Sequence, residues 1–106
     1  MESLGSQAPL HIEVGEGSDG PLIVVKGELD ISNVATLQAA IDLVLVTKPA
    51  YVGFDMSELS FIDSSGIALL VRTAKTVDRV RLVNPSRIVC RVVEISGLAS
   101  TLIGTP

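Results

Sequence analysis

Apolar and polar residues alternate in the first third of the chain with the two-residue period of β-strands. The alternation covers 10–14 and predicts a half-exposed strand. Glycines and a proline cluster over 15–21 and predict a turn, after which the β-branched run 22–29 predicts a second strand. We therefore expect the chain to open with a β-hairpin.

The pattern then changes to the spacing of amphipathic helices. Over 34–45 the apolar residues recur mainly three or four positions apart, which predicts a helix with one buried stripe. Ser32 is the predicted N-cap, and Pro49 stops this helix. A second apolar stripe at the same spacing covers 67–77, so a second amphipathic helix follows further along the chain.

Further strand and loop patterns lie between these two predicted helices and after the second one. Alternation over 51–56 predicts a third strand and the polar stretch 57–60 a loop, while 80–83 is the predicted fourth strand. A third helix is expected between Pro85 and Gly97, because Arg87 and Arg91 lie four positions apart and the apolar residues of 88–93 lie at helical spacing. Its predicted start has a cap residue followed by proline in the first helical position, Asn84 and Pro85.

In chain order the predictions read strand, strand, helix, strand, helix, strand and helix. This is an α/β fold with a mixed sheet of four to five strands and three main helices, and a last short strand over 100–103 stays open. At 106 residues we expect one domain spanning 1–106. Its core covers 10–98, with a flexible N-terminus over 1–8 and a short C-terminal segment over 99–106.

Carboxylates stand at two predicted strand-to-helix connections. Asp30 follows the second strand, and Asp63 directly precedes the second helix. Because the carboxyl ends of parallel strands lie at one edge of a sheet, we expect these two residues to be neighbours on one rim. Glu28 and Asp30 are either a solvated strand end or part of a rim that faces a partner.

Composition and charge narrow the function classes. The formal net charge is −4 and aromatic residues make up 3%, which disfavours nucleic-acid binding. Cys90 and His11 are single residues of their kinds, so we expect no disulfide, no metal site and no cofactor. The sequence has no basic leader and no run of roughly 18 apolar residues, and we expect a cytoplasmic protein without membrane insertion.

The residues Asp63-Ser64-Ser65-Gly66, here called the junction segment, carry the most informative chemistry. They lie where an apolar strand-like run gives way to a helix. Asp63 is the predicted N-cap, and both serines fall in the first turn, where free N–H groups and the helix dipole favour negative charge. A phosphate on Ser64 would be well tolerated there. The four residues alone also fit an ordinary helix start.

Catalysis lacks the necessary residues. Ser64 is not in a Gly-x-Ser-x-Gly elbow, the sequence has no glycine-rich phosphate loop, and the histidine lies on the first predicted strand. We expect a binding protein and not an enzyme.

Five segments in order along the chain resemble the STAS domain family, and within it the bacterial anti-sigma factor antagonists. They are Gly27-Glu28-Leu29-Asp30, Asp55-Met56-Ser57-Glu58-Leu59, Phe61-Ile62-Asp63-Ser64-Ser65-Gly66-Ile67, Leu82-Val83-Asn84-Pro85 and Ile95-Ser96-Gly97-Leu98.

The resemblance implies a partner switch. Ser64 matches the serine that an anti-sigma factor serine kinase phosphorylates. The unphosphorylated domain would bind that kinase and free a sigma factor, and a metal-dependent serine phosphatase would reverse the phosphorylation. Asp30 and Asp63 match the acidic positions beside the acceptor. The expected partner-binding residues are Asp30, Ser32, Asn33, Asp63, Ser64, Ser65 and Gly66.

Two departures from the family pattern bear on assembly and function. The link 76–79 looks short, and the chain ends at Pro106 where relatives often continue, which leaves self-association open. The alternative function is a non-phosphorylated STAS accessory subunit of a lipid-transport ABC complex or of a stress-signalling assembly.

Overall fold

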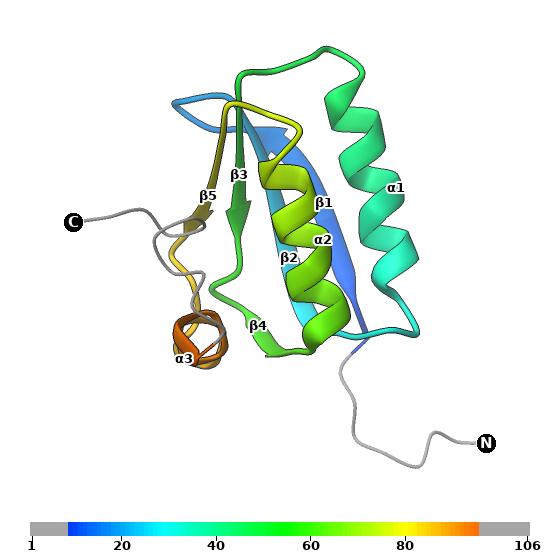
Figure 1. Ribbon diagram of the computed structural model, residues 1–106, viewed down its shortest axis with the longest axis vertical. Helices are drawn as coiled ribbons and strands as arrows, with labels where there is room; N and C mark the ends of the chain where they lie inside the picture. The colour runs from blue at the N-terminus through cyan, green and yellow to red at the C-terminus, as the bar shows by residue number, and fades with distance from the viewer. Residues whose placement is uncertain (1–8, 96–106) are drawn as a thin grey trace.

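The computed structural model describes residues 9–95, which form one sheet and three helices (Figure 1). The elements in chain order are β1 (His11–Glu16), β2 (Pro21–Leu29), α1 (Val34–Leu45), β3 (Tyr51–Asp55), β4 (Leu59–Ile62), α2 (Ser64–Ala74), β5 (Arg79–Val83) and α3 (Arg87–Ile95).

The five-stranded sheet has the order β1-β2-β3-β5, and β4 pairs with β2 beside that path. β1 and β2 form the predicted antiparallel hairpin, and the other pairs are parallel. β2 serves two neighbours in succession, pairing with β3 over 22–24 and with β4 over 27–29. The register shifts between Gly27 and Glu28, and Gly27 has φ +97°, a backbone conformation that glycine adopts without strain.

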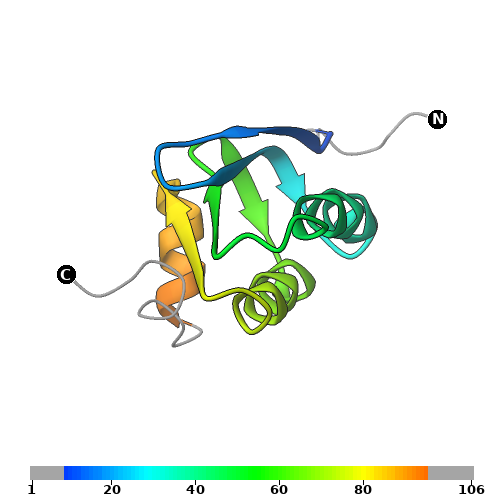
Figure 2. The ribbon, with the colours of Figure 1, turned by 90° about the horizontal axis from the view of Figure 1, so that it is seen from above.

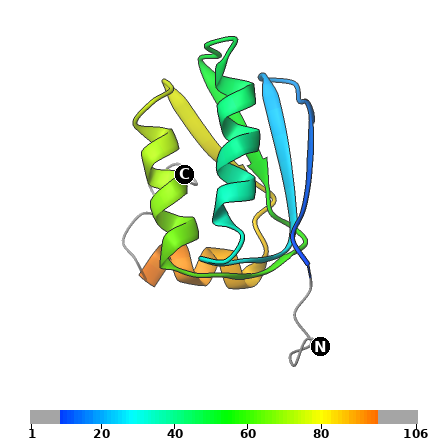
Figure 3. The same cartoon turned by 90° about the vertical axis from the view of Figure 1, so that its right-hand side faces the viewer.

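α1 and α2 pack side by side on one face of the sheet (Figure 2). α3 lies crosswise to them at the end of the molecule where α2 begins (Figure 3) and contacts β4. The core between these layers holds Ile23, Val25, Leu29, Leu37, Ile41, Val52, Phe54, Met56, Leu59, Leu69, Leu70, Leu82, Val89 and Val93 among its buried side chains. In residues 9–95 no helix has the length and apolarity needed to cross a membrane.

The predicted α/β class, mixed sheet and element order are confirmed. The loop predicted over 57–60 is wrong in part, because β4 starts at Leu59. In β4 two buried residues, Leu59 and Ile62, lie on either side of two exposed ones. The alternation of buried and exposed positions that identifies a strand in sequence is therefore absent. The last short strand, over 100–103, lies outside the described residues.

Two predicted helix caps are also wrong. α1 begins at Val34, and Ser32 lies in the turn before it. α3 begins at Arg87, and its cap is the Ser86 hydroxyl, which accepts a hydrogen bond from the Val89 N–H at 3.3 Å. Asn84 instead adopts φ +48° in the connection from β5.

Candidate functional site

Asp63 caps α2 and also holds the ends of β2 and β4 together. Its Oδ1 accepts hydrogen bonds from the backbone N–H of Ser65 at 2.9 Å and of Gly66 at 3.2 Å. Its Oδ2 accepts from the backbone N–H of Ile31 at 3.2 Å. The Asp63 N–H donates to the Leu29 carbonyl at 3.2 Å. The predicted cap is therefore confirmed, and the same carboxylate binds the loop that follows β2.

The surroundings of Asp63 favour its charged form. Partial desolvation raises the pKa of Asp63, but the hydrogen bond from the Ser65 hydroxyl and the backbone N–H bonds from Gly66, Ile31 and Ser65 lower it further. The net pKa lies below the usual value for aspartate, because each donor stabilises the carboxylate. The junction segment thus carries a fixed negative charge at neutral pH.

Asp30 organises a second turn beside the first. Its Oδ1 accepts hydrogen bonds from the Ser32 N–H at 2.9 Å and from the Ser32 hydroxyl at 2.6 Å. Asn33 braces the same loop, since its Oδ1 accepts from the Asp30 N–H at 2.9 Å and its Nδ2 donates to the Glu28 carbonyl at 2.8 Å. Ser32 and Asn33 therefore shape this loop, and neither side chain caps α1. Asp30 and Asp63 lie on one rim, as expected, because the N–H of Ile31, the residue after Asp30, donates a hydrogen bond to Asp63.

The two serines of the junction segment differ in their surroundings. The Ser65 hydroxyl donates to Asp63 Oδ1 at 2.5 Å and is half-buried. Ser64 is exposed, and its hydroxyl has no hydrogen-bond partner among residues 9–95. Of these two hydroxyls, that of Ser64 is therefore the one that is both accessible and without a hydrogen-bond partner in the described part of the chain.

Gly66 is buried beneath this surface. A Cβ at Gly66 would lie 2.8 Å from Ile62 Cγ1 and 2.8 Å from Leu29 Cδ2. The role of Gly66 is therefore steric, because the absence of a side chain lets α2 begin close to the ends of β2 and β4.

Sequence reasoning missed two apolar residues at the rim. Ile31 is 76% exposed and Phe61 is 45% exposed. Ile31 lies between Asp30 and Ser32, and its N–H bonds Asp63. The available signal was an isolated isoleucine within a polar loop, outside both the strand alternation and the helical stripe. The rim therefore combines fixed carboxylates with apolar side chains, a composition suited to binding a protein.

The described residues hold no group of three or more His, Cys, Asp or Glu side chains arranged for a metal ion. The chemistry of this rim is that of a hydroxyl beside carboxylates.

The model of the STAS domain family matches residues 13–105 of the chain. The chain belongs to the STAS domain family. No curated protein matches its sequence. Several solved structures resemble this STAS domain, among them an anti-sigma factor antagonist from Mycobacterium paratuberculosis with a TM-score of 0.81. That pair is 23% identical over 89% of this chain and 83% of the other, so the likeness concerns the fold.

Two further structures are of SpoIIAA, and both are 25% identical to this STAS domain. The anti-sigma factor antagonist SpoIIAA in its unphosphorylated form has a TM-score of 0.74, over 91% of this chain and 89% of its own. The Bacillus cell fate determinant SpoIIAA in its phosphorylated form has a TM-score of 0.66, over 92% of both chains.

Proposed function

We propose that this STAS domain is an anti-sigma factor antagonist switched by phosphorylation of Ser64. In the unphosphorylated form it binds an anti-sigma factor serine kinase and so frees a sigma factor. Phosphorylation of Ser64 ends that binding, and a metal-dependent serine phosphatase restores it. The domain acts in the cytoplasm as a binding module and not as an enzyme.

The observation that carries this proposal is the contrast between the two serines. Ser64 offers an exposed hydroxyl without a partner in the described part of the chain, whereas Ser65 is bound to Asp63. The similarity to SpoIIAA, which has both an unphosphorylated and a phosphorylated form, supports the same choice.

A phosphoryl group on Ser64 leaves the fold intact in this proposal. Ser64 is the first residue of α2, where the helix dipole favours an anion and the group, close to −2 in charge, remains in water. Binding is a different matter, because an interface would remove that water beside the Asp63 carboxylate. A charge buried without a partner weakens binding by about 3–4 kcal/mol, which is some hundredfold to a thousandfold in affinity.

The partner-binding surface follows from the rim. Asp30, Ser32 and Asn33 present one loop, Asp63 and Ser64 present the other, and Ser65 and Gly66 support the second from behind. We add Ile31 and Phe61 as the apolar contacts, because both side chains remain exposed in the described residues 9–95.

The test is binding to the cognate anti-sigma kinase with and without ATP. Ser64→Ala binds and resists release by ATP, and Ser64→Asp binds poorly. Ala50→Asp is the matched control, since Ala50 is exposed and precedes β3 at the opposite end of the parallel strands, and it binds like wild type. Phosphate mapped by mass spectrometry to another residue would overturn the proposal. So would binding that ATP leaves unchanged, the outcome expected of an accessory subunit.

A further inference from the structure

β1 forms a free edge of the sheet. It pairs with β2 on one side, without interruption from His11 to Glu16, and no other described strand pairs with its second side. Figure 3 shows β1 at the margin of the molecule, outside β2, and β1 also contacts α1. The backbone groups on the outer side of such a strand are ready to pair with another strand.

An exposed apolar surface lies next to this edge. Val14 on β1 is 55% exposed, and Leu43 and Val46 near the end of α1 are 75% and 73% exposed. Val14 and Leu43 also line one cavity of about 310 Å³ between β1 and α1. Exposed apolar residues gathered at an unpaired sheet edge are typical of a surface that another protein covers.

We propose that a second copy of this chain covers it, in a symmetric dimer that pairs the two β1 strands antiparallel about a two-fold axis at Ile12. The two faces of β1 determine that register. Ile12 pairs with the buried Val25 and Val14 with the buried Ile23, so both point to the face that carries the helices. With the axis at Ile12, Val14 lies opposite Leu10 of the second copy on that face.

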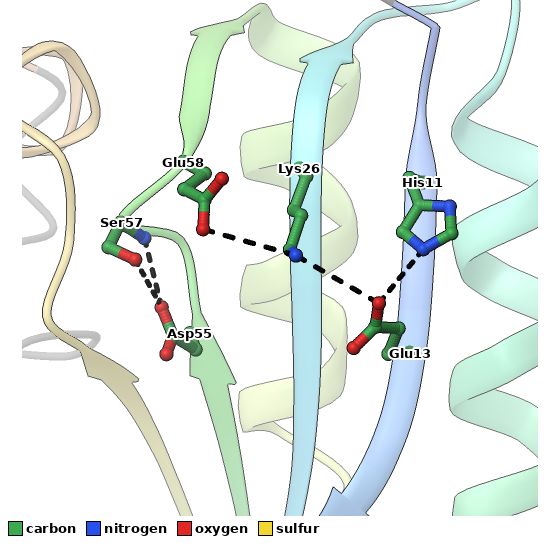
Figure 4. A network of polar contacts seen from close by, with 6 residues as sticks. All are labelled: His11, Glu13, Lys26, Asp55, Ser57 and Glu58. Atoms are coloured by element: carbon green, nitrogen blue, oxygen red, sulfur yellow. Dashed lines mark hydrogen bonds and ion pairs between the residues drawn. The ribbon is translucent and has the colours of Figure 1, made fainter.

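The charged face selects the same register. His11 Nε2 lies 2.9 Å from Glu13 Oε2, and Lys26 Nζ lies 3.9 Å from the same oxygen (Figure 4). The axis at Ile12 places His11 opposite Glu13 of the second copy and so extends this network across the interface. An axis one residue later would set Glu13 against Glu13, and like charges directly opposite are destabilising.

The same axis explains the exposed side of α1. An isologous two-fold interface through a sheet edge keeps both copies of α1 on the same face of the joined sheet. The two helices then flank the axis, and Leu43 and Val46 face the second copy. One arrangement therefore covers the strand edge and the apolar helix surface together.

The first measurement is the mass of the full chain in solution, by sedimentation from micromolar to millimolar concentration. Wild type reaches about twice 11.1 kDa. Val14→Glu stays at the single-chain mass with a wild-type circular dichroism spectrum. Ile88→Glu is the matched control, because Ile88 is 47% exposed on α3, and it remains dimeric. A monomeric wild type, or a Val14→Glu variant that dimerises as well as wild type, overturns the proposal.

The register has its own test. Glu13→Lys weakens the dimer, and adding His11→Glu restores it, since a carboxylate at position 11 then lies opposite the ammonium group at position 13 of the second copy. In a Cys90→Ser background, Ile12→Cys cross-links with a short bifunctional maleimide, whereas Ile88→Cys does not. Failure of the charge swap together with absence of the Ile12→Cys cross-link contradicts pairing at Ile12.

Discussion

Replacing Gly66 by alanine tests the packing beneath the junction segment. Gly66 is a helical residue of α2, and alanine is favoured over glycine in helices by about 1 kcal/mol. Helix propensity alone therefore predicts a more stable protein. The structure predicts the opposite, because the new Cβ would lie 2.8 Å from atoms of both Ile62 and Leu29. These side chains are 3% and 0% exposed and have little room to move.

The magnitude follows from these two terms. Forcing an extra carbon into a packed core costs about 1–3 kcal/mol, which exceeds the propensity gain over most of that range. We expect Gly66→Ala to lower the free energy of unfolding by up to about 2 kcal/mol, the packing cost less the propensity gain. The strain also displaces the start of α2 relative to β2 and β4, so under the proposed function the variant binds the anti-sigma kinase more weakly than its loss of stability alone explains.

Urea unfolding followed by circular dichroism measures this change, with the midpoint as the readout at constant m-value. Ala68→Gly is the matched control, since Ala68 is exposed on the same helix and loses about 1 kcal/mol by propensity. Packing predicts that both variants are less stable than wild type. A Gly66→Ala protein more stable than wild type would refute the reasoning.

Two further predictions concern the core and the cap. Leu37 on α1 is 0% exposed, so Leu37→Ala should lower the free energy of unfolding by about 2–5 kcal/mol; wild-type urea stability would show that α1 is misplaced. Asp63→Asn should be less stable than wild type at neutral pH by an amount that shrinks in acid. Because the folded pKa of Asp63 lies below its ordinary value of 3.8, the carboxylate's contribution is complete above that value and is lost as the pH falls through the folded pKa. A difference that stays constant from neutral pH down to acid unfolding would contradict this.

The parts of the fold that the sequence predicts are those with local causes. α2 and its cap were predictable, because Asp63 and the apolar stripe after it act within one or two helical turns. The start of α1 was not, since the Ser32 hydroxyl bonds Asp30 and not the helix. As a cap the Ser32 oxygen would accept from a backbone N–H of the helix, whereas here its O–H donates to Asp30, and only the folded loop decides between these two roles.

The site was less predictable than the fold because it depends on contacts between distant segments. The exposed Ile31 is held in place by the bond from its N–H to Asp63, 32 positions along the chain. β4 forms because β2 changes its pairing partner at Gly27, and the residues 59–62 have no sequence pattern that indicates this change. A single sequence gives the position of a rim residue along the chain but does not show which other loop contacts it in the fold.

One local motif recurs at the ends of three strands and explains how the rim presents its residues. In Asp30-Ile31-Ser32, Asp55-Met56-Ser57 and Asp63-Ser64-Ser65 the aspartate Oδ1 accepts from both the N–H and the hydroxyl of the serine two positions later.

The hydrogen bonds of this turn do not involve the side chain of the middle residue, so different residue types can occupy that position. Met56 enters the core with 0% exposure, whereas Ile31 and Ser64 are exposed. The bond from the Ile31 N–H to Asp63 holds two of these turns together. An apolar contact and a hydroxyl are thereby presented side by side on a rigid base, and a phosphoryl group on Ser64 would alter what a partner meets without altering the turn that holds it.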